Sequence, residues 1–201
     1  RSLAENGVAT DLSNLCEHGI DHLISLMPSY SLIIPGAPTY FHHAPPVFMD
    51  FLEKIPKSAH GQAAAILSTF GGVSSGVVQY DLAKILFKKK YRLLGGIQVL
   101  AEHCLTFQDE APFYGGRPYD EDLRIIRQFG ENLAVRLQDD NKPFYPPEAF
   151  SDKPPLMNFI DNHINNLKTF AWTMPGVKVR RDVCTGCGLC LKNCPTRNIT
   201  L

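Results

Sequence analysis

The sequence lacks any net charge, because its 20 Lys and Arg residues balance its 20 Asp and Glu residues. This balance gives no reason to expect nucleic-acid or membrane binding from bulk charge. No apolar run approaches the roughly 18 residues that span a bilayer, and no secretory signal is present. Catalytic triads and metal-hydrolase motifs are also missing. What remains is a chain of 201 residues, 44% hydrophobic, with the ordinary composition of one or two globular domains.

Six cysteines are the most informative part of the composition. Cys16 and Cys104 stand alone, whereas four others crowd into eleven residues near the C-terminus: Cys184, Cys187, Cys190 and Cys194. A secreted disulfide scaffold spreads its cysteines among its loops, so this crowding indicates metal ligands in a reducing compartment. We therefore expect a cytoplasmic protein in which Cys16 and Cys104 are small apolar residues of the core.

The clustered cysteines follow the pattern C-x2-C-x2-C-x3-C-P, the run that binds a [4Fe–4S] cluster in bacterial ferredoxins. Gly186 and Gly188 allow the loop to wrap closely, and Pro195 turns the chain away after the last cysteine. Zinc is the alternative metal, but zinc sites normally pair two cysteine units across a longer gap. In two-cluster ferredoxins the fourth cysteine of such a run binds the other cluster. Cys194 therefore either closes a single cluster or serves a second one whose other ligands lie outside this sequence.

The preceding sequence alternates short apolar runs with amphipathic stretches, as α/β proteins do. The pattern predicts strands at residues 8–12, 31–34, 62–67 and 93–100. It predicts helices at residues 20–27, 45–55, 77–89 and 120–137. This order implies parallel strands with right-handed crossovers, and hence an α/β fold with a doubly wound parallel sheet.

Prolines crowd into residues 138–155 and mark a domain boundary. We divide the chain into a sheet domain at residues 1–137, a linker with a bridging helix at residues 138–176, and a cysteine module at residues 177–201. The bridging helix is expected at residues 156–172.

Ligands of doubly wound sheets bind beyond the carboxyl ends of the strands. Two such ends carry unusual loops, GAPTYFHH at residues 36–43 and STFGGVSSG at residues 68–76. Together with the ferredoxin run, these loops resemble those of the flavodoxin–ferredoxin fusion proteins of anaerobic microbes, and the similarity covers nearly the whole chain. The resemblance implies a flavodoxin-like domain that binds FMN beside a ferredoxin-type domain with two [4Fe–4S] clusters. It also implies electron transfer, with a redox protein as donor or acceptor.

The resemblance further implies which residues contact the flavin ring. The first contacting loop would contain Pro38, Thr39, Tyr40 and Phe41, and the second Ser68, Thr69, Phe70, Gly71 and Gly72. The aromatic ring of a residue such as Tyr40 stacks on a flat cofactor ring, and glycines let backbone N–H groups approach its polar edge. His42 and His43 are expected to be solvated.

The sequence departs from the flavodoxin pattern at its start. Flavodoxins hold the FMN phosphate in a Ser/Thr/Gly loop after their first strand, at a helix N-terminus. This sequence begins with Arg1, inside what the family places as the following helix. We interpret the chain as a fragment without that strand and loop, which puts FMN binding by this stretch in question.

Two other functions fit the same residues. The long segment 101–119, with Glu102 and His103, is large enough to form a lid over a flavin that reduces a small organic substrate. That arrangement would make the protein an oxidoreductase enzyme rather than an electron carrier. A structural zinc module on a flavin-free sheet domain is the third alternative.

Overall fold

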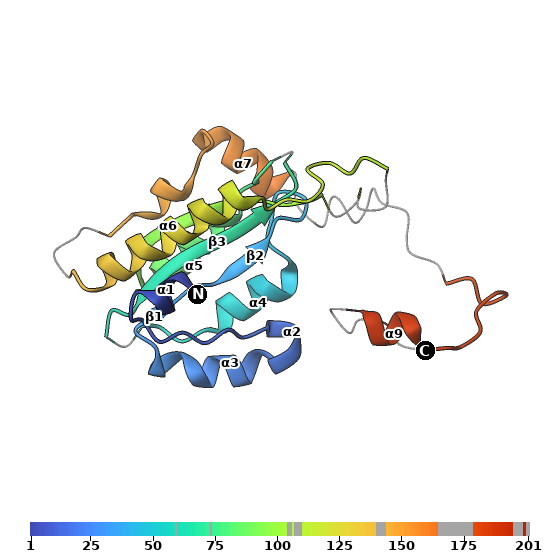
Figure 1. The fold of residues 1–201 in the computed structure, drawn as a ribbon, viewed down its shortest axis with the longest axis horizontal. Coiled ribbons are helices and arrows are strands. Elements are labelled where there is room, and N and C mark those ends of the chain that lie inside the picture. Colours follow the sequence, from blue (N-terminus) through green and yellow to red (C-terminus); the bar gives the residue numbers. More distant parts are fainter. Residues whose placement is uncertain are drawn as a thin grey trace.

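A computed structural model describes residues 1–58, 60–72, 74–103, 106, 110–139, 144–164, 179–194 and 199. Its centre is a parallel sheet in which β3 pairs with every other strand (Figure 1). The strands are β1 (Leu32–Ile33), β2 (Gly36–Pro38), β3 (Ala63–Phe70) and β4 (Arg92–Leu100). β1 and β2 pair along one side of β3, and β4 pairs along the other, all in parallel. The predicted parallel sheet is therefore confirmed.

β1 and β2 are two parts of one extended segment that Pro35 interrupts. Gly36 faces Leu67 in the register, and the Leu67 amide donates to the Pro35 carbonyl at 3.1 Å. The strand predicted at residues 31–34 thus forms as β1, whereas β2, after Pro35, was not expected. Proline removes one amide donor but keeps its carbonyl, so a strand with only one described neighbour continues past it. Because pairing resumes in β2, the chain leaves the sheet beside the end of β3.

The strand predicted at residues 8–12 does not form. The side chain of Leu12 is 98% exposed, and the neighbouring Asp11 carboxylate accepts a hydrogen bond of 2.7 Å from the Tyr30 hydroxyl. None of the described strands pairs with this segment. A short segment of alternating apolar residues forms a strand only when a neighbouring strand offers an edge with which it pairs.

Helices cover both faces of the sheet, so the predicted doubly wound architecture is confirmed. Alternate residues of β3 point to opposite faces, with Ala64 and Ile66 in one core and Ala63 and Ala65 in the other. The first core takes its helical side chains from α3 (Ile20–Leu26), α4 (Pro46–Lys54) and α5 (Val78–Lys88). The second takes them from α1 (Ser2–Glu5) and α6 (Asp120–Leu137).

The four predicted helices of the sheet domain form close to their expected ends. The shorter elements are α2 (Leu15–His18), η1 (Met27–Ser29), η2 (Pro147–Phe150) and α9 (Leu189–Asn193). The predicted bridging helix begins as α7 (Pro155–His163), and its residues 165–172 lie outside the described residues. Among the described residues, no helix has the length and apolar character needed to cross a membrane.

Much of the predicted linker packs on the sheet domain. Phe150 of η2 is 7% exposed and belongs to the first core. Just before it, the Tyr145 amide donates to the Leu93 carbonyl of β4 at 3.0 Å. The polypeptide therefore crosses the outer side of β4 and then returns, through η2, to α7.

Candidate functional site

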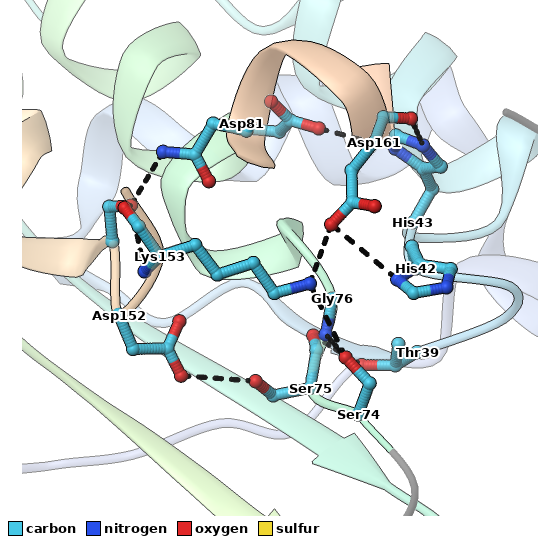
Figure 2. Close-up of polar contacts among 12 residues, drawn as sticks. Thr39, His42, His43, Ser74, Ser75, Gly76, Asp81, Asp152, Lys153 and Asp161 are labelled. Carbon is cyan, nitrogen blue, oxygen red and sulfur yellow. Dashed lines mark hydrogen bonds and ion pairs between the residues drawn. The ribbon is translucent and has the colours of Figure 1, made fainter. Parts of the chain in front are cut away.

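The two predicted flavin loops meet at the carboxyl ends of β2 and β3. We define the first loop as residues 38–43 and the second loop as residues 71–76. The Thr39 amide donates to the Thr69 carbonyl at 2.7 Å, and the Thr39 hydroxyl donates to the Ser75 carbonyl at 3.3 Å (Figure 2). The Val77 amide, just after the second loop, donates to the His42 carbonyl at 2.8 Å. Parallel pairing of β2 with β3 thus produces the juxtaposition that the sequence predicts.

The first loop forms a tight turn that exposes two aromatic side chains. Tyr40 and His43 exchange two backbone hydrogen bonds of 2.8 and 3.0 Å. Between them, Phe41 and His42 adopt left-handed conformations with φ of 47° and 70°. This region is unfavourable for residues other than glycine. As a result the side chains of Tyr40 and Phe41 are 46% and 39% exposed, where a planar ligand would find them.

The second loop contains glycines that no larger residue replaces without a clash. A Cβ atom at Gly71 would lie 2.6 Å from Cδ2 of His103. A Cβ atom at Gly72, where φ is 85°, would overlap the ring of Tyr114. His103 and Tyr114 belong to residues 101–119, which we define as the third loop. The described part of the third loop therefore lies directly against the second loop at His103 and Tyr114.

The remaining predicted contact residues differ in their accessibility. Pro38, Thr39, Thr69 and Phe70 are half-buried, whereas Ser68 is 1% exposed. Within the described part of the chain, no hydrogen-bond partner reaches the buried Ser68 hydroxyl. Ser68 therefore lies inside the sheet, below the residues that reach its carboxyl edge.

A buried carboxylate from α7 lies behind the first loop. Asp161 is 1% exposed, and its Oδ2 accepts a hydrogen bond of 2.5 Å from Nζ of Lys153 (Figure 2). The same oxygen lies 3.6 Å from Nδ1 of His42, which is an electrostatic contact rather than a hydrogen bond. The ring of His43 lies 3.0 Å from the Asp161 carbonyl oxygen and 3.4 Å from Oδ2 of Asp81. The first loop is thereby held against both α5 and α7.

The expectation of solvated histidines is wrong for this structure. The His43 side chain is 13% exposed and the His42 side chain is 29% exposed. Burial lowers the pKa of His42, and the positive charge of Lys153 lowers it further, whereas the Asp161 carboxylate opposes the shift. The charged groups around the histidines come from distant parts of the chain: Asp81 from α5, Lys153 from a loop, and Asp161 from α7. Their spacing in the sequence therefore does not indicate that they lie close together.

The segment before α7 also holds the second loop. Nζ of Lys153 lies 3.4 Å from Oγ of Ser74, and the Ser75 hydroxyl donates to Oδ2 of Asp152 at 3.2 Å (Figure 2). Gly76 fits closely beneath the first loop, because a Cβ atom there would overlap the His42 carbonyl. The segment before α7 therefore holds both predicted flavin loops in place.

The cysteine module has the local geometry of a ligand loop. Gly186 and Gly188 adopt left-handed conformations with φ of 67° and 70°, and Gly188 is the N-cap of α9. Among the described residues, Cys184, Cys187, Cys190 and Cys194 form no disulfide. Hydrogen bonds from the Leu189 amide and from the Thr185 side chain lower the pKa of Cys187. Donors directed at a thiolate in this way favour the deprotonated ligand that metals require, so the residues present fit a cluster.

The four thiols do not yet enclose a common point. Among the described residues, no group of three or more His, Cys, Asp or Glu side chains is arranged to hold a metal ion. Metal sites in small modules form together with metal binding, because the metal itself gathers the deprotonated ligands. Pro195 lies outside the described residues, as does the lone Cys104, whereas Cys16 is half-buried.

The fold and the two sites define a flavodoxin-like domain followed by an iron–sulfur module. Residues 11–105 match the family described as NADPH-dependent FMN reductase, and residues 177–200 match the 4Fe-4S binding domain. The matches indicate FMN and a [4Fe–4S] cluster as cofactors, and together they support a redox role. This two-part organisation confirms the resemblance to flavodoxin–ferredoxin fusions.

A solved structure with a TM-score above 0.5 supports this fold. A metal-soaked flavodiiron core from Synechocystis sp. PCC6803 is 18% identical, with a TM-score of 0.53 over 68% of this chain. The present chain spans only 30% of that protein. A flavodoxin from the domain Archaea is 14% identical, with a TM-score of 0.49, covering 69% of this chain and 84% of that one. No curated protein sequence matches this chain.

Proposed function

We propose that this chain passes electrons between a [4Fe–4S] cluster in the cysteine module and an FMN at the first and second loops. The convergence of these loops at the carboxyl edge of the sheet is the observation that carries the proposal, because this edge is where doubly wound sheets bind their ligands. The predicted division into residues 1–137, 138–176 and 177–201 is retained as part of it. So is the predicted cytoplasmic location, which rests on the crowded cysteines.

The residues of the first loop would bind one face of the flavin. Tyr40 and Phe41 offer exposed rings for stacking, and the turn between Tyr40 and His43 fixes their direction. Backbone groups at Gly71 and Gly72 would approach the polar edge of the ring. FMN, when bound, supplies a group that accepts and returns electrons. The protein residues orient that group and control access of water to it.

The cysteines would hold the cluster. Cys184, Cys187, Cys190 and Cys194 supply the four thiolates, and the left-handed Gly186 and Gly188 shape the loop around them. The proposal assigns all four to a single cluster, which requires no ligand from elsewhere. A redox protein would serve as the external donor or acceptor.

An oxidoreductase activity is the second candidate, because the third loop lies against Gly71 and Gly72. A lid in this position would enclose a small organic substrate over the flavin. The exposure of Tyr40 and Phe41 favours the carrier, since a carrier needs an accessible flavin edge. Steady oxidation of reduced flavin by a small substrate, without any redox protein, would favour the enzyme.

Anaerobic purification with iron, acid-labile sulfide, zinc and flavin analysis tests the proposal. Four irons and four sulfides per chain are expected for one cluster held by four cysteines. Cys187→Ser should lose this iron, whereas Cys16→Ser, which alters a lone cysteine, should keep it. Zinc in place of iron would overturn the cluster assignment.

FMN binding by the same protein is measured separately by titration. Tyr40→Ala should weaken FMN binding about 3- to 10-fold, because aromatic stacking contributes about 0.5–1.5 kcal/mol. Tyr145→Ala removes a similarly exposed tyrosine that lies beside β4, away from both loops, and serves as the control. Equal affinities of the two variants would contradict the assignment of the first loop.

A further inference from the structure

His42 lies between an aromatic residue of the first loop and a buried carboxylate. It directly follows Phe41, and the two rings meet edge to face with their centroids 5.7 Å apart. Its Nδ1 lies 3.6 Å from Oδ2 of Asp161 (Figure 2). The imidazole of His42 thus contacts both a residue that the proposed function places against the flavin and a charged group of α7.

The backbone of His42 is held by both loops. Its φ of 70° is part of the tight turn of the first loop, and its carbonyl accepts a hydrogen bond of 2.8 Å from the Val77 amide. A Cβ atom at Gly76 would overlap this carbonyl, so the second loop packs directly on His42. The imidazole is therefore carried on a backbone that leaves little freedom to move away from Asp161.

The His42 ring has a buried nitrogen that a proton would bring into use. Among the described residues, Nδ1 has no hydrogen-bond partner, and 3.6 Å from Asp161 is too long for a hydrogen bond. A neutral imidazole has one N–H group, whereas a protonated one donates from both nitrogens. Protonation would convert the contact with Asp161 into an ion pair. Because the side chain is 29% exposed, the proton can come from solvent.

The charges nearest to His42 already balance while His42 is neutral. Oδ2 of Asp161 accepts a hydrogen bond of 2.5 Å from Nζ of Lys153, so the carboxylate has a cation closer to it than His42 (Figure 2). Burial lowers the pKa of His42, and the charges of Lys153 and His43 lower it further, whereas Asp161 opposes the shift. His42 is therefore mostly neutral at pH 7 and available to accept a proton.

The other ionisable groups near the first loop are also engaged. His43 lies 3.4 Å from Oδ2 of Asp81, and Oδ1 of Asp81 pairs with Nζ of Lys84 at 2.9 Å. Asp152 is exposed, so water screens its charge. A further negative charge at the first loop would therefore act on a neutral His42 beside an already paired carboxylate.

We propose that His42 takes up a proton from solvent when the flavin at the first loop gains an electron. This inference rests on the proposed function, which places FMN against Tyr40 and Phe41. The electron comes from the external redox protein through the cluster, the proton adds to the ring nitrogen of His42 that lacks one, and reoxidation returns both. Asp161 is a positioning residue, because its carboxylate faces the protonated ring.

The size of the effect follows from the separation of the charges. A flavin stacked on Phe41 lies within about 10 Å of His42, because stacked rings are about 4.5 Å apart and the Phe41 and His42 centroids are 5.7 Å apart. At an effective dielectric constant of about 20, a unit charge at this distance raises the proton affinity of His42 about tenfold. A tenfold rise corresponds to about half a proton more per flavin reduced, near the pH at which His42 titrates.

Proton uptake during anaerobic reduction of the intact chain, loaded with FMN and cluster, tests this coupling with a pH indicator. Near pH 6.5 the unmodified chain should take up about half a proton more per flavin reduced than His42→Asn. Asparagine tolerates the left-handed backbone and does not titrate. His22→Asn removes an exposed histidine of α3 and is the matched control, which should behave like the unmodified chain. Protons taken up by the cofactors themselves are common to all three proteins and cancel.

NMR titration of the His42 ring in the unmodified chain covers the case in which His42→Asn folds poorly. The pKa of His42 should be higher after reduction of the bound FMN than before. An unchanged pKa, or equal proton uptake with and without His42, would overturn the coupling in a protein that still binds and reduces FMN, and would leave the proposed function intact. An equal loss of uptake in His22→Asn would also overturn it. A chain that binds no FMN would refute both proposals.

Discussion

Replacing Asp161 by alanine should destabilise the sheet domain strongly, because this residue carries a buried charge that serves both flavin loops. Asp161→Ala leaves the Lys153 ammonium without its carboxylate partner and removes the acidic neighbour of His42. Both groups lie where water has limited access. The loss is therefore expected to exceed that of an average surface substitution.

The magnitude follows from the burial of the two partners. Removing one member of a fully buried ion pair costs about 3–5 kcal/mol. Asp161 is 2% exposed at its side chain, but Lys153 is 20% exposed and regains some hydration, so we reduce the expected loss to about 2–3 kcal/mol. For a chain of this length each kcal/mol lowers Tm by about 2–4 °C, giving a total shift of about 4–12 °C.

The assay is a double-mutant cycle read by urea unfolding. Single variants are Asp161→Ala and Lys153→Met, and the double variant carries both changes. Replacing an ion pair by apolar residues is often nearly neutral, so the double variant should lose less stability than the sum of the single variants. Strictly additive losses, or a cost below about 1 kcal/mol for Asp161→Ala, would refute the reasoning.

Three further predictions concern the loops and the module. Gly72→Ala should lower the free energy of unfolding, measured in urea, more than Gly7→Ala does. Both glycines have positive φ, but only at Gly72 would an added Cβ atom meet a side chain. Equal losses in the two variants would contradict the tight contact. The pKa of His42 is lowered on folding, so its protonation favours the unfolded chain and stability should fall as pH drops below about 6.5. This acid sensitivity should be weaker in His42→Gln, and unchanged sensitivity would exclude His42 as its source. If the two parts fold separately, iron chelation of the purified cluster-loaded protein should leave the Tm of the sheet domain unaltered. This Tm is followed by near-ultraviolet circular dichroism. A large drop in Tm would instead show that the two parts stabilise each other.

Periodicity was sufficient to predict the framework of the sheet domain. Long apolar runs such as residues 62–67 and 93–100 are buried on both faces, and strands of that type are recognisable from composition alone. The meeting of the first and second loops also followed, since the ends of parallel strands share one edge of the sheet. The cysteine spacing likewise indicated the iron–sulfur module that the 4Fe-4S domain match supports.

Other features depend on contacts between distant segments and left no local signal. Pro35 has the sequence signature of a strand end, yet its carbonyl still accepts from Leu67 and the ladder continues. The two histidines look like surface residues until α7 brings Asp161 behind them. A helix that buries Asp161 and exposes Phe159 also contradicts the usual interpretation of an amphipathic pattern.

The segment around Tyr145 covers one end of β4, an outer strand of the described sheet. A free sheet edge is a template on which a second molecule adds a strand, and such pairing leads to aggregation. Here the Tyr145 amide already occupies the Leu93 carbonyl. Pro146 and Pro147 follow at once, and neither offers a backbone donor to an incoming strand. The prolines that mark the linker in the sequence thus also hinder strand pairing with a second copy at this end of β4.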